Sequence, residues 1–408
     1  EKQRVGRLSM DFLHEGLPQM NLKAKWSGKR EDELWNKRAK ETLPTNIYEL
    51  LPVLLNKENV ASKRDWVKQY DQEVQAGTQI KPFVGKQQRS PGNSGVVSLE
   101  NQGGEENSAV SIGCGLAPRW SSVDAKMMAM LSVDEAVRNI IATGANPDKI
   151  CLLDNFCWPD PIKSEKTPDG EEKLGDLVRS CEGLYDICTL YKAPLVSGKD
   201  SMKNDFRGTN NKGDALKISI KPTLLVTAMG HVDSRYTCES YLKNEEATLF
   251  ILGRDQRTLI GSEVKQHFNV EADSYNEMDF DQCLLTYKCV YSLITNKVLN
   301  SCHDISEGGL LCALSEKCFD NDLEVNIDFK CIDSDLLRFT YGEGPGQFIV
   351  SVNQTNMKKF ENACLENKLE VVKIGEASKS NHGKLNISNN DKAVSSFSTD
   401  ALLQAWQR

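Results

Sequence analysis

A polar stretch at residues 194–205, P-L-V-S-G-K-D-S-M-K-N-D, gathers the residue types that a phosphate site needs. Gly198 lets backbone N–H groups approach a ligand, and Lys199 supplies a positive charge. Asp200 offers a carboxylate to Mg²⁺, and Ser201 adds a hydroxyl. The apolar pair before them predicts a buried strand that ends in a polar turn. An ordinary surface loop would show the same pattern, because G-K-D-S is shorter than the P-loop motif.

Two further side chains with oxygen atoms, Glu135 and Asn139, lie four residues apart in a stretch with helical periodicity. Ser132 and Glu135 predict a capping box at the start of this helix, and Gly144 predicts its end. Residues four apart share one face of a helix, so Glu135 and Asn139 could hold one divalent cation together. The alternative is a solvated outer face with a capping glutamate.

Two more polar stretches could supply ligand groups. Asp154 comes after the apolar run 150–153, at a position that favours ligand groups and also commonly opens a turn. The stretch 301–310, S-C-H-D-I-S-E-G-G-L, places Asp304 and Ser306 at the N-terminus of a predicted helix. The dipole and free N–H groups there favour an anion, although both residues could be helix caps only.

The elements that must position these residues predict two successive α/β units. Strand, helix, strand, loop and strand make the first unit, and residues 218–232 supply its last strand, with Pro222 at an edge or near the start. Strands and helices alternate again in the second unit. We therefore expect an α/β fold with a helical lead-in at residues 1–80, one domain at 81–235 and another at 236–408.

The composition limits the class of protein. Of the 408 residues, 39% are hydrophobic and 26% charged, as in soluble globular proteins. The net charge of -8 argues against a nucleic-acid partner, and the apolar runs are too short to span a membrane. The 13 cysteines occur without a C-x-x-C motif, which indicates reduced thiols in a cytoplasmic chain. The first residue is not methionine, so we expect a piece of a longer polypeptide.

Five motifs, taken together and in order, resemble phosphoribosylformylglycinamidine synthase. They are S-V-D-E-A-V-R-N-I-I-A-T-G-A, L-D-N-F-C-W-P-D-P, A-P-L-V-S-G-K-D-S-M-K-N, I-K-P-T-L-L-V-T-A-M-G and C-H-D-I-S-E-G-G-L. The lead-in stretches M-D-F-L-H and Q-Y-D-Q-E-V-Q are also similar to segments that precede the second half of this synthetase. The family performs the ATP- and glutamine-dependent amidation step of purine synthesis, so the resemblance implies a C–N ligase.

The resemblance also implies a fold and a reaction. The fold is that of aminoimidazole ribonucleotide synthetase (PurM-like), with an N-terminal α/β half-barrel that forms a pseudo-dimer interface and a C-terminal three-layer α/β domain. ATP phosphorylates the formamide oxygen of formylglycinamide ribonucleotide, and ammonia displaces the phosphate. Cations on the transferring phosphate and groups that position the amide would stabilise the transition state. The implied cofactors are ATP or ADP and Mg²⁺.

Carried over position by position, the resemblance assigns one group of residues to ATP and substrate. Asp154 and Gly198 match positions that contact ATP, and Ser201 matches a hydroxyl that contacts the substrate. Lys199 stands where many members have a metal-binding asparagine. Its ammonium cannot ligate Mg²⁺, so we expect a direct phosphate contact, with Asp200 assisting at the metal.

A second group of residues matches a second nucleotide site of the longer family members. Glu135, Asn139 and Asp304 match its metal ligands, and Ser306 matches a contact to the nucleotide. Asn93 stands where the family usually has an aspartate, which would weaken the metal shell.

The resemblance implies that catalytic parts lie outside this chain. None of the five histidines lies in the His-Asn-His-Pro-like motif of the family's first half, and no glutaminase domain follows Arg408. We expect no catalytic residue here and no turnover by the chain alone. The expected partners are the first half of the synthetase and a glutaminase domain or subunit, or a second copy when the chain is isolated. Alternatives are a non-catalytic module that holds a nucleotide, and a homodimeric enzyme like aminoimidazole ribonucleotide synthetase.

Overall fold

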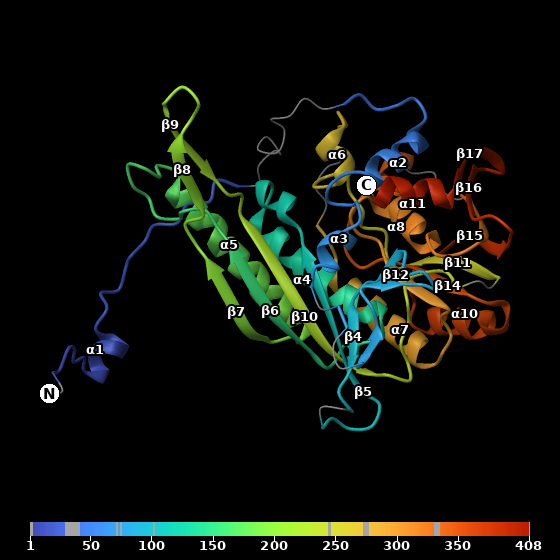
Figure 1. The fold of residues 1–408 in the computed structure, drawn as a ribbon, viewed down its shortest axis with the longest axis horizontal. Coiled ribbons are helices and arrows are strands. Elements are labelled where there is room, and N and C mark those ends of the chain that lie inside the picture. Colours follow the sequence, from blue (N-terminus) through green and yellow to red (C-terminus); the bar gives the residue numbers. More distant parts are fainter. Residues whose placement is uncertain are drawn as a thin grey trace.

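Two α/β domains follow one another along the chain, each built on one sheet (Figure 1). This computed structural model describes residues 3–28, 41–70, 72–73, 76–100, 103–243, 246–271, 277–329 and 335–407. The lead-in contributes α1 (Met10–Glu15), η1 (Ile47–Glu49), α2 (Leu50–Leu55) and α3 (Arg64–Val67). The short strand pair β2 (Phe83–Val84) and β3 (Ser90–Pro91) follows it.

The first domain contains a six-stranded sheet. Its strands, in spatial order, are β1 (Thr78–Ile80), β4 (Gly95–Ser98), β5 (Ser108–Leu116), β10 (Thr223–Asp233), β6 (Ile150–Cys157) and β7 (Leu195–Ser201). Neighbours are antiparallel except β6 and β7, which run parallel because the helix α5 (Gly170–Tyr191) connects them.

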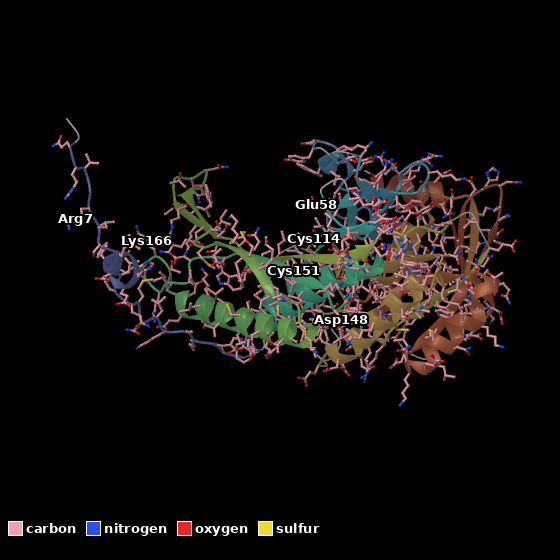
Figure 2. The ribbon with its side chains drawn as sticks, turned by 90° about the horizontal axis from the view of Figure 1, so that it is seen from below. Arg7, Glu58, Cys114, Asp148, Cys151 and Lys166 are labelled. Atoms are coloured by element: carbon pink, nitrogen blue, oxygen red, sulfur yellow. The ribbon has the colours of Figure 1, made fainter. Side chains whose placement is uncertain are left out.

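Among the described residues, helices cover one face of this sheet and leave the other open. The helix α4 (Ala125–Ala142) packs on β5 and β10, and α5 packs on α4. The other face exposes apolar side chains, with Ile112 and Met229 each 43% exposed. Figure 2 labels Cys114 and Cys151 on this open face, with α5 running below them in that view. The expected half-barrel is confirmed, because the sheet remains open rather than closing on itself.

Helix α4 begins earlier than the sequence pattern predicts. Asp124, not Ser132, is the N-cap, and its side chain accepts a hydrogen bond from the backbone N–H of Lys126. The intervening A-K-M-M-A-M-L consists of strong helix formers, so the helix extends back through it. Ser132 instead donates to the carbonyl of Met128 inside the helix. The predicted end is correct, since Gly144 has φ +106°.

Two strands are longer than predicted, and one is divided. Strand β6 continues through Asp154 because β10 and β7 pair with it on both sides up to Cys157. The turn predicted at Gly198 is absent, since β7 runs on to Ser201. Residues 218–232 are not one strand, because Pro222 lies between β9 (Ala215–Ser219) and β10 and cannot donate to a ladder. Strand β9 instead pairs with β8 (Asp205–Thr209) in a hairpin that projects from the domain (Figure 1).

The second domain has a seven-stranded sheet between two helical layers, as expected for a three-layer domain. In spatial order the strands are β12 (Ser301–Asp304), β14 (Phe348–Val352), β11 (Ala247–Leu252), β15 (Val371–Lys379), β13 (Leu323–Asp328), β16 (Lys384–Asn389) and β17 (Lys392–Ser398). One face packs against α7 (Phe280–Thr295) and α10 (Met357–Glu366), and the other against α8 (Gly309–Cys318), α11 (Thr399–Gln407) and the lead-in helix α2. The short helices are α6 (Glu263–His267), α9 (Leu336–Tyr341) and η4 (Gln354–Asn356).

The two domains share one hydrophobic core. Side chains of α4 and α5 lie in the same buried cluster as side chains of α7, including Ile140, Ile187 and Tyr287. Within the described ranges, no helix combines the length and apolar composition needed to cross a membrane. The cysteines that the structure describes are free thiols.

Candidate functional site

Four of the sequence-predicted ligands converge where the two domains meet. Glu135 and Asn139 lie on α4, Asp304 is the last residue of β12, and Ser306 lies in the loop before α8. The Oγ of Ser306 lies 2.9 Å from Glu135 Oε1 and 2.7 Å from Asp304 Oδ2. We call these four residues, together with Asn93 and Arg138, the Glu135 cluster.

Sequence reasoning did not find Arg138, which sits inside this cluster. Its Nε lies 3.4 Å from Asp304 Oδ2, and its Nη2 lies 3.2 Å from Ser306 Oγ. Asp134, fully buried on the same helix, accepts a 2.7 Å bond from Arg138 Nη1. The sequence did carry a signal, because an acid and a base four residues apart in an otherwise apolar helix are expected to pair.

Asn93 contributes an amide from the segment before β4. Its Nδ2 donates to Asn139 Oδ1 over 3.2 Å and to Asp304 Oδ1 over 2.8 Å. His303 lies behind it, with Nδ1 2.8 Å from Asn93 Oδ1 and Nε2 2.9 Å from Glu316 Oε2. The amide therefore links Asn139 of the first domain to Asp304 of the second domain.

The cluster offers oxygen atoms, which are the ligand type that a hard cation such as Mg²⁺ binds. Glu135 and Asp304 supply carboxylate oxygens and Asn139 an amide oxygen, which are ligands that Mg²⁺ accepts when water or phosphate completes its shell. In the part of the chain that the structure describes, no three His, Cys, Asp or Glu residues are grouped so as to hold a metal by themselves. Burial raises the pKa of Glu135 well above its usual value, and the negative charge of Glu307 adds to this.

A second buried network adjoins the cluster. Arg119, in η3 (Pro118–Ser122), reaches across the domain junction to a carboxylate oxygen of Glu263, and its Nη2 lies 3.1 Å from Glu343 Oε2. Glu343 Oε1 in turn accepts bonds from the backbone N–H of Gly308 over 2.9 Å and of Glu263 over 2.8 Å. We expected an anion at the N-terminus of α8. The carboxylate of Glu343 takes this place, because it accepts a bond from the backbone N–H of Gly308.

The cavity in this region is small. It has a volume of about 60 Å³ and is lined by residues that include Glu135, Arg138 and Ser306. Sites for small molecules typically measure roughly 300–1,000 Å³, so this cavity as it stands has room for a phosphate-sized group and not for a nucleoside. Trp120 also lines a neighbouring cavity of about 1010 Å³ between α4, α5 and the start of α7.

Glu343 makes the stability of this junction depend on pH. Burial raises its pKa to about 7 from an ordinary 4.5, although the charge of Arg119 opposes the shift. Between these two values the folded chain holds a proton that the unfolded chain has released. The raised pKa of Glu343 therefore adds to the free energy of unfolding below pH 4.5. This stabilisation is lost as the pH rises to about 7.

We expect the substitution Glu343→Gln, which removes the titrating group, to reduce the fall in the urea midpoint of unfolding between pH 4.5 and about 7. Glu376→Gln, at an exposed position of β15, is the matched control and should leave the pH dependence unchanged. Parallel pH profiles for wild type and Glu343→Gln would contradict this assignment.

The other predicted group lies on the paired strands β6 and β7. Asp154 is directly opposite Gly198, and a Cβ on Gly198 would lie 2.6 Å from Asp154 Oδ1. Glycine is therefore required for the close approach of this carboxylate. Asp154 and Asp200 both line a cavity of about 690 Å³ beside α5. Desolvation raises the pKa of Asp154, and the charge of Asp200 adds to the shift.

The alternation of side chains along β7 separates residues that are neighbours in sequence. Gly198 and Asp200 face α5, whereas Lys199 and Ser201 face the open side of the sheet, where Lys199 Nζ lies 2.5 Å from Ser201 Oγ. Asp200 lines the cavity at Asp154, which shares no lining residue with the cavity at Glu135. The two groups of predicted residues thus border separate cavities.

Comparisons with known proteins agree with this architecture. Residues 92–232 match the N-terminal domain of AIR synthase related proteins, and residues 244–388 match their C-terminal domain. The phosphoribosylformylglycinamidine synthase subunit PurL of Lactobacillus helveticus is 28% identical over 315 residues, which are 77% of this chain and 38% of that protein. The subunit PurL of Prochlorococcus marinus strain MIT 9301 is also 28% identical, over 95% of this chain and 49% of that protein. The chain thus spans about half the length, or less, of these relatives.

Solved structures share the fold. Thermotoga maritima PurL complexed with ADP aligns with a TM-score of 0.62 at 16% identity, over 90% of this chain and 53% of that one. The same protein complexed with FGAR aligns with a TM-score of 0.62 at 15% identity, over 88% of this chain and 54% of that one. At this level of identity the likeness concerns the fold alone.

Proposed function

Because the chain belongs to the AIR synthase related family, we propose that it is part of a phosphoribosylformylglycinamidine synthase. Such an enzyme is an ATP-dependent C–N ligase that amidates formylglycinamide ribonucleotide in purine biosynthesis. The names of the relatives and the shared fold support this proposal. The chain corresponds to only part of those relatives, so the proposed activity requires partners that supply the rest: a first synthetase half and a source of ammonia.

The observation that carries the proposal is the open face of the first sheet. Lys199 and Ser201 lie on it beside the exposed apolar side chains of Ile112, Leu153 and Met229. An apolar sheet face of this kind is a docking surface. A second half-barrel that covers it would bury the apolar residues and enclose the two polar ones in a shared site.

In the proposed reaction the residues of this chain bind and orient. Lys199 places a positive charge near the transferring phosphate, and Ser201 holds the formamide of the substrate by its hydroxyl. Asp154 and Asp200 are proposed to bind ATP in the cavity beside α5, on the other face of the sheet from Lys199 and Ser201. A magnesium ion bound there would neutralise charge on the phosphates. No general acid or base is assigned to this chain.

A separate role is proposed for the Glu135 cluster. Its cavity lies in the junction between the domains and shares no lining residue with the Asp154 cavity. The separation of the two cavities supports a second role, in which a nucleotide, ATP or ADP, is held by Ser306 and the oxygens of Glu135, Asn139 and Asp304 without turnover. The cavity must widen to accept it, because 60 Å³ is too small for a nucleoside.

Mixing the chain with a separately purified first half of the synthetase tests the proposal. With ammonia as nitrogen donor, neither part alone should convert formylglycinamide ribonucleotide, and the mixture should release ADP and phosphate. Ser201→Ala should lower the rate of the mixture at least about tenfold, because it removes a hydrogen bond at the reacting amide. Ser398→Ala, at an exposed serine of β17, is the matched control. Full activity of the isolated chain would instead indicate a homodimeric enzyme.

A further inference from the structure

The amide nitrogen of Asn93 occupies the position where the Glu135 cluster would hold a cation. It donates to Asp304 Oδ1 at 2.8 Å and to Asn139 Oδ1 at 3.2 Å. These two oxygens belong to the proposed metal ligands. A cation coordinated by both must lie within about 2–2.6 Å of each, and the NH₂ group stands between them.

The orientation of this amide is determined by its neighbours. A carboxylate only accepts hydrogen bonds, so the edge of Asn93 that faces Asp304 is its NH₂ group. The oxygen edge then faces His303, whose Nδ1 lies 2.8 Å away. Glu316 Oε2 lies 2.9 Å from Nε2 on the other side of the ring, and His303 is only 5% exposed. Turning the amide over would set its oxygen against the carboxylate of Asp304, which offers no donor.

The remaining oxygens are also satisfied without a cation. Asp304 Oδ2 has Arg138 Nε at 3.4 Å, and Glu135 Oε2 accepts a 2.7 Å bond from the backbone N–H of Leu116. Ser306 Oγ has one proton, which it can donate to Glu135 Oε1 at 2.9 Å or to Asp304 Oδ2 at 2.7 Å. When it donates to Glu135 Oε1, each carboxylate oxygen of Glu135 and Asp304 has a partner within this chain without a cation.

We propose that Asn93, positioned by His303, keeps the Glu135 cluster closed to divalent cations until a nucleotide is bound. The proposal builds on the nucleotide-holding role assigned to this cluster above. A phosphate oxygen offers the Asn93 amide another acceptor, so a bound nucleotide can draw the NH₂ group away from Asp304 and Asn139. Binding is then ordered, with the nucleotide first and the cation second.

Calorimetric titration of the nucleotide-free chain with MgCl₂ tests this inference. We expect no binding to wild type at millimolar concentrations. Asn93→Asp replaces the blocking donor by a third carboxylate and should raise the affinity for Mg²⁺ at least about tenfold. Asn353→Asp makes the same change of charge beyond the other end of β14 and should leave the affinity unchanged. Tight binding to the wild type, or no gain in Asn93→Asp, would overturn the proposal.

The positioning role of His303 has its own test in the same titration. His303→Phe removes the ring nitrogen beside Asn93 Oδ1, so the amide can turn its oxygen to the cluster and the affinity for Mg²⁺ should rise. His303→Gln retains a donor and should stay closer to wild type. Equal affinities of His303→Phe and wild type would remove His303 from the proposal. Should a variant fail to fold, the wild-type titration still decides whether the cluster is closed.

These titrations contain neither nucleotide nor substrate, so their outcome is independent of the proposed activity. A parallel titration with ADP in the presence of EDTA should show binding that does not need a cation. Absence of ADP binding would contradict the nucleotide role of the cluster, whereas the closed state of the free chain would stand on the MgCl₂ result. Binding of Mg²⁺ before ADP would contradict the proposed order.

Discussion

Replacing Arg119 with methionine should lower the free energy of unfolding by at least about 3 kcal/mol, because two buried carboxylates lose their shared counter-charge. Arg119 is 7% exposed, and Glu263 beside it is fully buried. The guanidinium also bonds to the backbone carbonyl of Gly261, so it links the first domain to the second at three points. Its charge contributes to holding the pKa of Glu263 at about 2, well below the ordinary value.

Urea denaturation followed by circular dichroism measures this effect as a shift of the unfolding midpoint. Arg235→Met is the matched control, because Arg235 pairs with Asp233 on the surface, where ion pairs contribute little. Combining Arg119→Met with Glu343→Gln should recover part of the loss, since one of the uncompensated carboxylates is then removed. An Arg119→Met midpoint that matches the Arg235→Met midpoint would show that the network does not join the domains.

Replacing Asp134 with alanine should have a comparable effect, about 3 kcal/mol or more. Asp134 is fully buried and accepts bonds from Arg138 Nη1 and from the hydroxyls of Tyr191 and Tyr287. Its loss leaves a guanidinium and two hydroxyl groups without this acceptor. Arg138 would no longer be held between Asp304 and Ser306, so we also expect weaker binding of ADP.

The same urea experiment, combined with ADP titration, separates the two consequences of this change. Tyr287→Phe removes a single donor to Asp134 and should cost only about 1 kcal/mol, with ADP binding retained. Asp134→Asn keeps an acceptor for the hydroxyls and should lie between the two. If Asp134→Ala were no more destabilising than Tyr287→Phe, the carboxylate would not be the centre of this network.

Local sequence patterns predicted the elements and the fold class well. The expected alternation of strands and helices in the second unit is present, and its strands β11 and β14 are short apolar runs of the kind that predicts buried strands. The five motifs in order led to a synthase with this fold, and the matching N- and C-terminal domains confirm the wider AIR synthase related family. The residue boundaries proposed for the domains and the roles of the site residues stay predictions.

Local patterns predicted the wrong ends of elements where strand pairing or neighbouring helix formers outweighed the preference of a single residue. Ser132 resembles a cap, yet the helix formers before it continue the helix. Asp154 and Gly198 resemble turn residues, yet both lie inside strands, because each strand gains a complete ladder with its neighbour. Polar residues are therefore weak markers of a strand end when a neighbouring strand pairs with the chain beyond them.

The sequence by itself determined that Glu135 and Asn139 share a helix face, because four residues make about one helical turn. Only the tertiary structure decided that Asn93, Arg119 and Arg138 meet the acidic residues of the second domain, since these contacts join residues far apart in the chain. It also decided that the side chains of Lys199 and Asp200 lie on opposite faces of the first sheet. That separation arises only when β7 pairs with β6, because an isolated stretch has no faces to separate.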